Sequence, residues 1–296
     1  MRHFLAALVL LSLSGAASGG TARTHDAAYW RAVITGGYAV PEGESPAALI
    51  RELSGLLGSP DPEERDAFAY GIPARWIYAQ ELLVPRDLRK LVDAWSANLT
   101  QGIGETGDES VLLRSFSALD LSILAALDNK SPFLGRAGFR DLLDAALRYL
   151  DAERDLRGYV PGTGWHHAVA HGADLLKFLA RSRHLTPAEQ RRILASIRRK
   201  LDVGLVYVWG EDERLARAVL SLVDREDLDR KAFQGWLAAL ERPSERLWEG
   251  ELDTARFMAV QNTRNTLRSL ALRLETSTAP AAAWARKEVL DTLSRL

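Results

Sequence analysis

The sequence of 296 residues contains no cysteine, and its formal net charge at pH 7 is only −1. Without cysteine there is no disulfide, no thiolate metal ligand, no thiol nucleophile and no lipid attachment to an N-terminal cysteine. The basic residues are scattered singly, so the charge pattern does not indicate binding to nucleic acid or to an anionic membrane surface. Hydrophobic residues at 47% and charged residues at 26% are typical of a globular protein. We therefore expect a self-sufficient core and a partner that is a small molecule, a peptide or a glycan.

The N-terminus carries an apolar run that is too short to cross a membrane. This run covers residues 4–13, whereas a bilayer needs roughly 20 apolar residues. Arg2 precedes the run and small residues follow it at 14–20, which is the layout of a secretory signal peptide. The alternative is a buried first helix. We predict a signal peptide over residues 1–19, a periplasmic or secreted location, and no membrane span in the mature chain.

Signals for β-strands are also nearly absent. The single cluster of β-branched and aromatic residues lies at 203–210. Almost every other segment after residue 45 has helical periodicity and ends at proline or glycine. Thr186, Pro187 and Glu189 form a capping-box pattern at one helix start. The pattern predicts about eleven helices, over residues 46–58, 61–71, 74–83, 85–99, 108–127, 136–152, 187–201, 211–223, 228–241, 251–274 and 280–295, besides a helix that follows the glycine-rich loop ending near residue 164.

Helices of this length joined by short turns predict an all-α fold of stacked antiparallel helix pairs. No repeat has a fixed period with fixed residues, so the stack is expected to be an irregular HEAT-like α-solenoid. A closed α/α ring is the competing arrangement. No linker-like stretch divides residues 20–296, which we treat as a single all-helical domain.

The segment 108–127 is predicted to be the central helix, because it is apolar on nearly all sides. Arg114 and Asp120 lie inside it, about 240° apart around the helix axis, so they do not pair with each other. A buried guanidinium needs a carboxylate partner. We predict that Arg114 reaches Asp155 or Glu153 from another segment. The alternative is that the Arg114 side chain extends to the surface.

The segment 153–176 concentrates most of the residues that can carry chemistry, including three of the six histidines. Its first half, with Asp155, Arg157 and Tyr159, is a glycine-rich loop in which some glycines are expected to have positive φ. Thr163 is predicted to cap the helix that follows. Conformationally restricted loops on a rigid scaffold are common places for function.

On that helix, His167 and His171 are i, i+4 neighbours, so both imidazoles could face one divalent metal ion or one substrate. Asp174 lies about 10 Å from His167 along the axis, so it would orient His171 or contact a second group. No glutamate lies between the histidines, so the zinc-protease pattern is missing. Two alternatives stay open: an acid–base or anion site without metal, and an ordinary amphipathic helix with a solvated polar face.

Other patterns are weaker. The acids at 211–213 are expected to stabilise a helix start. Asn262 and Asn265 either reach a pocket or give a helix surface its polarity. Trp165, Trp209 and Trp248 either line a sugar-binding cleft or pack in the core. No P-loop, nucleophile elbow or dinucleotide fingerprint is present.

Three stretches, RSFSAL at 114–119, the whole segment 153–176 and EDERLARA at 211–218, resemble the bacterial domain-of-unknown-function family numbered 2785. The matching pieces run from about residue 45 to 275. The resemblance implies a helical fold and no established activity. It points to Asp155, Arg157, Gly158, Gly164, Trp165, His167, His171 and Asp174, with Arg114, Glu211 and Arg214 as secondary positions and His166 as an unconstrained one. An exported chain departs from the usual picture of this family.

Two functions follow as hypotheses. The first is a metal-assisted or acid–base hydrolase, in which His167 and His171 are ligands or base and Asp155 is a ligand or acid. In that hypothesis Asp174 orients a histidine and Arg157 contacts an anion or oxyanion. The second is a helical scaffold without catalysis that binds a peptide, a glycan or an envelope protein. In both, one polar pocket forms where the glycine-rich loop meets the histidine-bearing helix.

Overall fold

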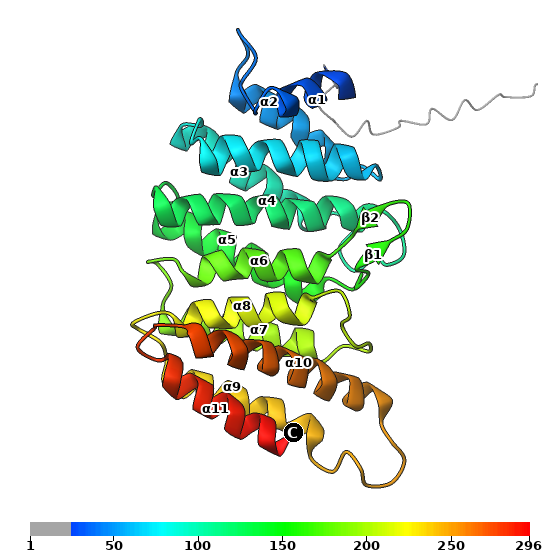
Figure 1. Ribbon diagram of the computed structural model, residues 1–296, viewed down its shortest axis with the longest axis vertical. Helices are drawn as coiled ribbons and strands as arrows, with labels where there is room; N and C mark the ends of the chain where they lie inside the picture. The colour runs from blue at the N-terminus through cyan, green and yellow to red at the C-terminus, as the bar shows by residue number, and fades with distance from the viewer. Residues whose placement is uncertain (1–24) are drawn as a thin grey trace, which may run out of the picture.

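A computed structural model describes residues 25–296, and the predicted signal peptide lies outside the described residues. The fold is a stack of antiparallel helix pairs in two layers (Figure 1). In the first layer α4 packs on α6, α6 on α8 and α8 on α10, and in the second layer α5 packs on α7, α7 on α9 and α9 on α11. The bounds are α4 (Ser110–Lys130), α5 (Gly135–Ala152), α6 (Ala168–Ala180), α7 (Pro187–Leu201), α8 (Glu211–Val223), α9 (Arg230–Glu241), α10 (Thr254–Thr276) and α11 (Ala282–Arg295).

The N-terminal end of the stack is formed by shorter elements. The two π-helices η2 and η3 pack against α4, and α3 packs against both α4 and α5. The helix break predicted at Gly71 and Pro73 is wrong, because Ile72 and Pro73 are themselves helical and join η2 to η3 without interruption. These elements are α1 (Ala27–Thr35), α2 (Pro46–Leu53), η1 (Ser54–Leu56), η2 (Glu63–Gly71), η3 (Ala74–Ala79) and α3 (Pro85–Asn98), with a further 3-10 helix, η4 (Arg242–Ser244), after α9.

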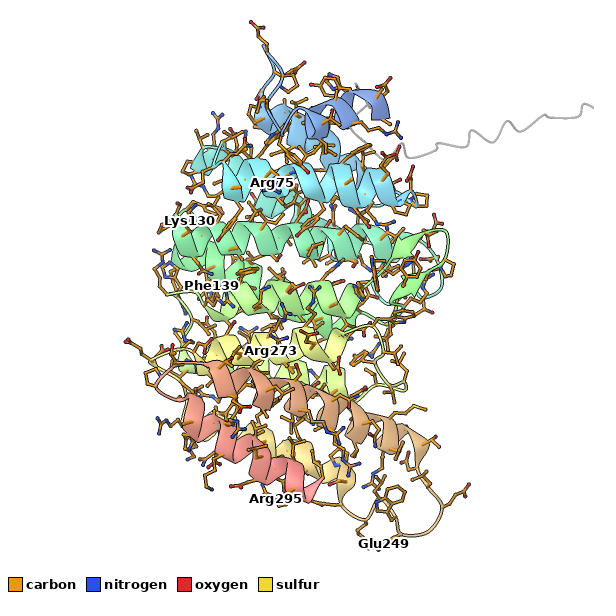
Figure 2. All side chains as sticks on the ribbon, in the orientation of Figure 1. Arg75, Lys130, Phe139, Glu249, Arg273 and Arg295 are labelled. Atoms are coloured by element: carbon orange, nitrogen blue, oxygen red, sulfur yellow. The ribbon has the colours of Figure 1, made fainter. Side chains whose placement is uncertain are left out.

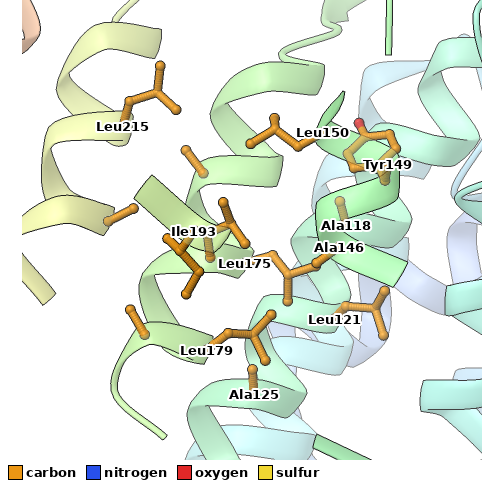
Figure 3. Close-up of a cluster of buried hydrophobic side chains, with 14 of the residues drawn as sticks. Ala118, Leu121, Ala125, Ala146, Tyr149, Leu150, Leu175, Leu179, Ile193 and Leu215 are labelled. Atoms are coloured by element: carbon orange, nitrogen blue, oxygen red, sulfur yellow. The ribbon is translucent and has the colours of Figure 1, made fainter. Parts of the chain in front are cut away.

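The N-terminal and C-terminal helices lie at opposite ends of the stack (Figure 1), so the molecule is an open solenoid and not a closed ring. The all-α prediction is confirmed. Leucine, isoleucine and alanine side chains fill the space between the layers, and side chains pack between all successive helices (Figure 2). Figure 3 shows Leu175 and Leu179 of α6 among side chains from α4, α5, α7 and α8. Burial of this apolar surface is the main source of stability for such a fold.

α4 is the central helix that the sequence predicts. Most of its residues are buried, because η3, α3 and α6 surround it. Within the described residues, α4 alone is long and apolar enough to cross a membrane by length and composition, and 83% of its most apolar window is buried inside the protein. α4 is therefore a core helix of this fold.

The two edges of the stack have loops of different length. On one edge, which we call the long-loop edge, the connections cover residues 99–109, 153–167, 202–210 and 242–253. On the opposite edge they cover only residues 131–134, 181–186, 224–229 and 277–281. Insertions in solenoids map to loops on one side, which is often the binding side. The segment 153–167, which carries most of the family pattern, belongs to the long-loop edge (Figure 1).

The segment 203–210, which holds the cluster of β-branched and aromatic residues, is a loop. The described sheet is instead a two-residue hairpin, β1 (Tyr159–Val160) paired antiparallel with β2 (Gly164–Trp165). Gly162, in the turn, and Gly164, at the start of β2, have φ of 90° and 77°, as predicted for glycines of this loop. Within the described residues, the segment 203–210 pairs with no strand. The buried side chain of Asn262 bonds their backbone, accepting from the amide of Tyr207 and donating to the carbonyl of Leu205.

Two capping predictions have different outcomes. The capping box at Thr186 and Glu189 is confirmed at the start of α7. The prediction that Thr163 caps the next helix is wrong, because residues 164 and 165 pair as a strand and α6 begins only at Ala168. His167 occupies the cap position with a φ of 47°, in the left-handed region.

Candidate functional site

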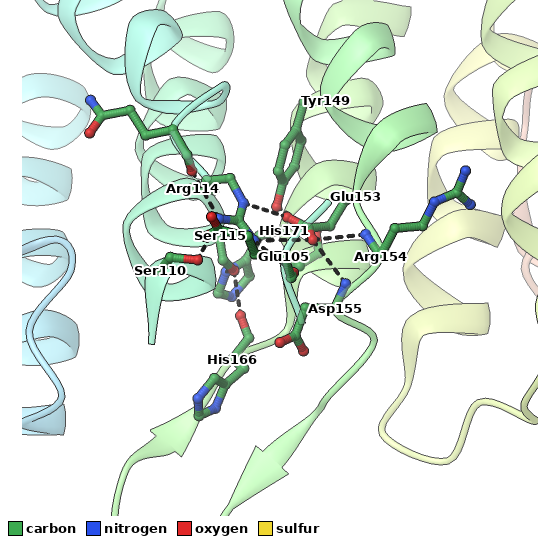
Figure 4. A network of polar contacts seen from close by, with 12 residues as sticks. Glu105, Ser110, Arg114, Ser115, Tyr149, Glu153, Arg154, Asp155, His166 and His171 are labelled. Carbon is green, nitrogen blue, oxygen red and sulfur yellow. Dashed lines mark hydrogen bonds and ion pairs between the residues drawn. The ribbon is translucent and has the colours of Figure 1, made fainter. Parts of the chain in front are cut away.

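A buried ion pair anchors the start of the α5–α6 loop. Arg114 and Glu153 are both 0% exposed, and the Arg114 Nε donates to the Glu153 Oε2 at 2.8 Å. Arg114 also donates to the Gln101 carbonyl at 2.9 Å and to the Ser110 hydroxyl at 2.8 Å (Figure 4). The prediction that Arg114 reaches an acid of the 153–155 segment is confirmed, and Glu153 is that acid. The pair joins α4 to the end of α5.

Glu153 holds the following residues as well. Its Oε1 accepts hydrogen bonds from the amides of Arg154 and Asp155, both at 2.9 Å (Figure 4). The Lys200 Nζ donates to the Glu153 carbonyl at 2.6 Å, and burial lowers the pKa of Lys200 to about 8. The sequence did not lead us to predict a role for Lys200. A lysine at an apolar position of an amphipathic helix, however, indicates a buried lysine with a polar partner.

Asp155 joins two loops of the long-loop edge. Its carboxylate accepts from the Arg157 Nε at 2.9 Å, from the Arg157 Nη2 at 2.6 Å and from the Gly107 amide at 3.0 Å. Arg157 also donates to the Asp108 carbonyl. Burial raises the pKa of Asp155, but the bonds from Arg157 and the backbone amides outweigh it and hold the pKa below its usual value. The ionised Asp155 carboxylate, together with Arg157, therefore connects residues 107–108 to residues 155–157.

The three neighbouring histidines are buried, so the interpretation of a solvated polar face is wrong. His166, His167 and His171 are 1%, 8% and 6% exposed. The reason is tertiary: helices pack on both sides of α6, and every residue of it except Lys177 and Phe178 is buried. His166 is the most buried of the three.

His167 contacts the α7–α8 loop. Its Nε2 lies 3.0 Å from the Trp209 carbonyl, which can only accept, so this nitrogen carries the proton. The Trp165 ring stacks on the imidazole with centroids 4.2 Å apart. The Glu211 Oε1 lies 4.0 Å from the same nitrogen. Burial lowers the pKa of His167, and burial raises that of Glu211.

His171 is bonded in the opposite direction, toward α4. Its Nδ1 lies 2.8 Å from the Ser115 hydroxyl, which also donates to the His166 carbonyl (Figure 4). A hydroxyl has one proton, so the His171 Nδ1 must be the donor to Ser115. Burial holds the pKa of His171 well below its usual value. Ser115 was missed by the sequence analysis, although a serine in a helix that is apolar on all sides is a signal for a buried hydrogen bond.

The candidate metal ligands do not converge. The His167 and His171 ring centroids are 5.7 Å apart with planes at 81°, and each ring is bonded to a different element. One expectation was that Asp174 would orient His171, but Asp174 contacts a second set of groups instead. It pairs with Lys177 at 3.1 Å and with Arg214 of α8. In the described part of the chain, no group of three or more His, Cys, Asp or Glu side chains could hold a metal ion. The metal site at His167 and His171 stays a prediction without a third donor.

A cleft of about 570 Å³ opens between the α5–α6 and α7–α8 loops on the long-loop edge. Four predicted site residues line it: Asp155, Arg157, Tyr159 and Glu211. The Glu211 Oε2 accepts from the Trp209 amide at 3.0 Å. The predicted pocket residues are therefore only partly brought together. Six other predicted site residues do not line this cleft: Arg114, Trp165, His167, His171, Asp174 and Arg214.

Three exposed aromatic rings contact one another beside the cleft, and we call Tyr159, Trp165 and Trp209 the aromatic cluster. Tyr159 and Trp209 line the cleft, and Trp165 contacts both of them. The pairwise centroid distances are 5.1 Å for Tyr159 and Trp165, 5.9 Å for Trp165 and Trp209, and 6.3 Å for Tyr159 and Trp209. The three residues are 44%, 37% and 46% exposed. Trp165 and Trp209 are therefore not core residues, which favours the alternative that placed them at a cleft. Trp248 lies in the α9–α10 loop, contacts Phe257 of α10 and is 71% exposed.

Gly158 supports this cluster for a steric reason. A Cβ atom at Gly158 would lie 2.1 Å from the Trp209 Cδ1, so the Trp209 side chain rests directly on the glycine backbone. Any side chain at position 158 would displace the indole. The hairpin is also anchored to η2, because Arg65 donates a hydrogen bond to the carbonyl of Thr163, next to Gly164, at 2.8 Å.

Asp120 has a separate environment inside α4. It is 0% exposed, and neither carboxylate oxygen has a hydrogen-bond partner among the described residues. Burial therefore raises the pKa of Asp120 well above its usual value. As the sequence analysis expected, it does not pair with Arg114.

We expect Asp120→Asn to raise the free energy of unfolding at pH 7. The folded protein holds a proton on Asp120 that the unfolded chain releases above its ordinary pKa of about 3.9, so wild-type stability falls as the pH rises above that value. The gain should grow by up to about 1.4 kcal/mol per pH unit and disappear near pH 4. Urea unfolding at pH 4, 5.5 and 7 measures it. Asp128→Asn is the control, because Asp128 accepts from the amides of Phe133 and Leu134 and should only destabilise. A loss of stability in Asp120→Asn at pH 7 would contradict this account.

The fold and the site define an all-α solenoid with a cleft built from the loops of one edge. The family model described as "Protein of unknown function (DUF2785)" matches residues 99–272, which is more than half of the chain. The protein belongs to this family. The match begins with the first loop of the long-loop edge and covers all four of them. No curated protein and no solved structure matches the chain.

Proposed function

We propose that this protein is a binding module without catalysis, in which a helical scaffold presents the long-loop edge to a ligand. One observation carries the proposal. The charged groups of the family pattern are bonded to the protein itself, whereas the aromatic cluster beside the cleft is exposed. Exposed tryptophan and tyrosine side chains offer large contact areas at low conformational cost and dominate binding surfaces.

The polar residues of the pattern act as supports in this proposal. Glu153 and Asp155 hold residues 99–109 and 153–157 together through their bonds to Arg114, Gly107 and Arg157. His167 fixes the Trp209 carbonyl and stacks on Trp165. Each of these bonds orders a loop before a ligand arrives, and such preorganisation favours affinity.

The competing function is an acid–base hydrolase, and one observation favours it. Glu211 lines the cleft 4.0 Å from His167, and the pKa of Glu211 is raised whereas that of His167 is lowered. Two titratable groups with opposite shifts are typical of an acid–base pair. The Glu211 carboxylate, however, already accepts from the Trp209 amide, and His167 already donates to the Trp209 carbonyl.

The proposal includes export. A chain with a cleavable signal peptide over residues 1–19 would meet its ligand in a periplasm or outside the cell. The N-terminal residue of the protein recovered from fractionated cells tests this part, and an intact Met1 in the cytoplasmic fraction would contradict it.

The central test is metal analysis of the untagged protein together with His167→Ala and His171→Ala. A support role predicts less than stoichiometric zinc, manganese or iron, and a loss of about 1–3 kcal/mol of stability in each variant, because each leaves a buried hydrogen-bonding group unpaired. His184→Ala, outside the segment 153–176, is the matched control. One metal ion per chain that is lost in His167→Ala with an unchanged melting temperature would overturn the proposal in favour of the enzyme.

A further inference from the structure

We infer that the ligand of the cleft is a neutral carbohydrate chain that stacks on the aromatic cluster. This inference rests on the binding function proposed above and names its ligand class. Three properties of the described residues support it: the charge balance of the cleft, the arrangement of the rings and the size of the opening.

The charges in the cleft balance each other. Its lining includes two arginines, Arg154 and Arg157, and two acids, Asp155 and Glu211. Asp155 is paired with Arg157, and Glu211 accepts from a backbone amide. A phosphate backbone needs a surplus of cations, which this cleft lacks. An uncharged ligand therefore complements this lining better than an anion or a cation does.

The three rings are in direct contact, with centroids 5.1 to 6.3 Å apart. The Trp165 plane is inclined at 72° to that of Tyr159 and at 81° to that of Trp209, so each ring offers its own face to a ligand. A cage for a cationic group would instead surround the cation with separated ring faces. A pyranose ring has an apolar C–H face and a rim of hydroxyl groups, so its face can lie on an indole while its hydroxyls reach the polar groups of the cleft. Mixed apolar and hydrogen-bonding surfaces of this kind suit the amphipathic side chains of tryptophan and tyrosine.

Two of the rings are held in place before binding. Trp165 stacks on His167, and Trp209 rests on the backbone of Gly158. Both therefore present a fixed exposed side to the ligand and lose little conformational freedom on binding. The cleft of about 570 Å³ lies within the range of roughly 300–1,000 Å³ that is common for sites of small ligands. It fits a few sugar units of a chain that continues beyond the open cleft.

The experiment is titration calorimetry of the full-length chain with a panel of neutral oligosaccharides, namely cellotetraose, maltotetraose, xylotetraose, mannotetraose and the tetramer of N-acetylglucosamine. At least one should bind with a Kd between micromolar and millimolar. Trp165→Ala and Trp209→Ala should each weaken that binding at least about tenfold, as is usual for a central aromatic contact. Trp248→Ala is the matched control, an exposed tryptophan outside the cluster, and should leave the Kd unchanged within twofold. Circular dichroism and melting temperatures verify that the variants are folded.

Gly158→Ala adds a second test of the same geometry. It should weaken binding by displacing Trp209, whereas Gly204→Ala in the facing loop meets open space and should not. The inference is overturned if no oligosaccharide binds, or if Trp248→Ala weakens binding as much as the cluster variants. If poly-L-proline binds at the cluster and no sugar does, the ligand class is wrong while the binding function stands. If His167 proves to hold a metal ion, the binding function itself falls.

Discussion

Replacing Arg114 by alanine is expected to lower the free energy of unfolding by about 3–5 kcal/mol, the usual cost of breaking a buried ion pair by removing one partner. The reason is that Glu153, which is 0% exposed, would lose the guanidinium that pairs with its buried carboxylate. The anchor of the α5–α6 loop would be lost with it. Urea unfolding followed by circular dichroism measures the change.

The control is Arg192→Ala, which removes an ion pair with Asp144 on the surface. These side chains are 47% and 32% exposed, and such pairs contribute at most about 1 kcal/mol. The double variant Arg114→Met, Glu153→Leu should be more stable than either single variant, because neither member of the ion pair is left without the other. A loss below about 1 kcal/mol in Arg114→Ala would show that Glu153 finds water or another partner.

Lowering the pH from 7 to 5 is expected to destabilise the protein strongly through its three buried histidines. Burial lowers the pKa of His166, His167 and His171 in the folded state, most of all for His171. In the unfolded chain the histidines have ordinary pKa values near 6.5, so they bind protons at a pH where the histidines of the folded chain do not. This penalty is absent above pH 6.5 and grows as the pH falls, to about 2 kcal/mol at pH 5 for His171 alone. The other two histidines act in the same direction.

Unfolding measured at pH 7.5, 6.5, 5.5 and 5.0 tests the prediction. In His171→Gln the slope of stability against pH should fall by up to about 1.4 kcal/mol per pH unit below pH 6. His184→Gln is the control and should leave most of the slope in place. A stability that is constant from pH 7 to pH 5 would mean that the imidazoles are protonated or reach water in the folded protein.

Local interactions explain why much of the fold was predictable. Helical periodicity and proline–glycine boundaries depend on residues within a few positions of one another, and they located α4, α5, α7, α8 and the later helices closely. The capping box at Thr186 is likewise contained in four residues. The need of Arg114 for an acidic partner was also predictable, because a guanidinium buried in an apolar helix demands a carboxylate from another segment.

The candidate site was predictable only as a set of residues. The i, i+4 relation of His167 and His171 was derived for a regular helix that begins near residue 165. In the structure a hairpin occupies residues 159–165, and His167 precedes α6 with a left-handed φ. The imidazoles therefore point toward two different elements. The prediction of a solvated face failed for a related reason, since α4 and α8 cover α6 on both sides.

The sequence alone determined the all-α class, the positions of most helices, and the need of Arg114 for an acidic partner. It did so because these properties arise from short-range periodicity, from capping and from the cost of an isolated buried charge. The tertiary structure decided which polar side chains serve as supports, which aromatic rings reach solvent, and that the long loops share one edge. Those outcomes depend on contacts between residues some 40 to 100 positions apart, such as Arg65 with Thr163 and His167 with Trp209, and no local pattern encodes them.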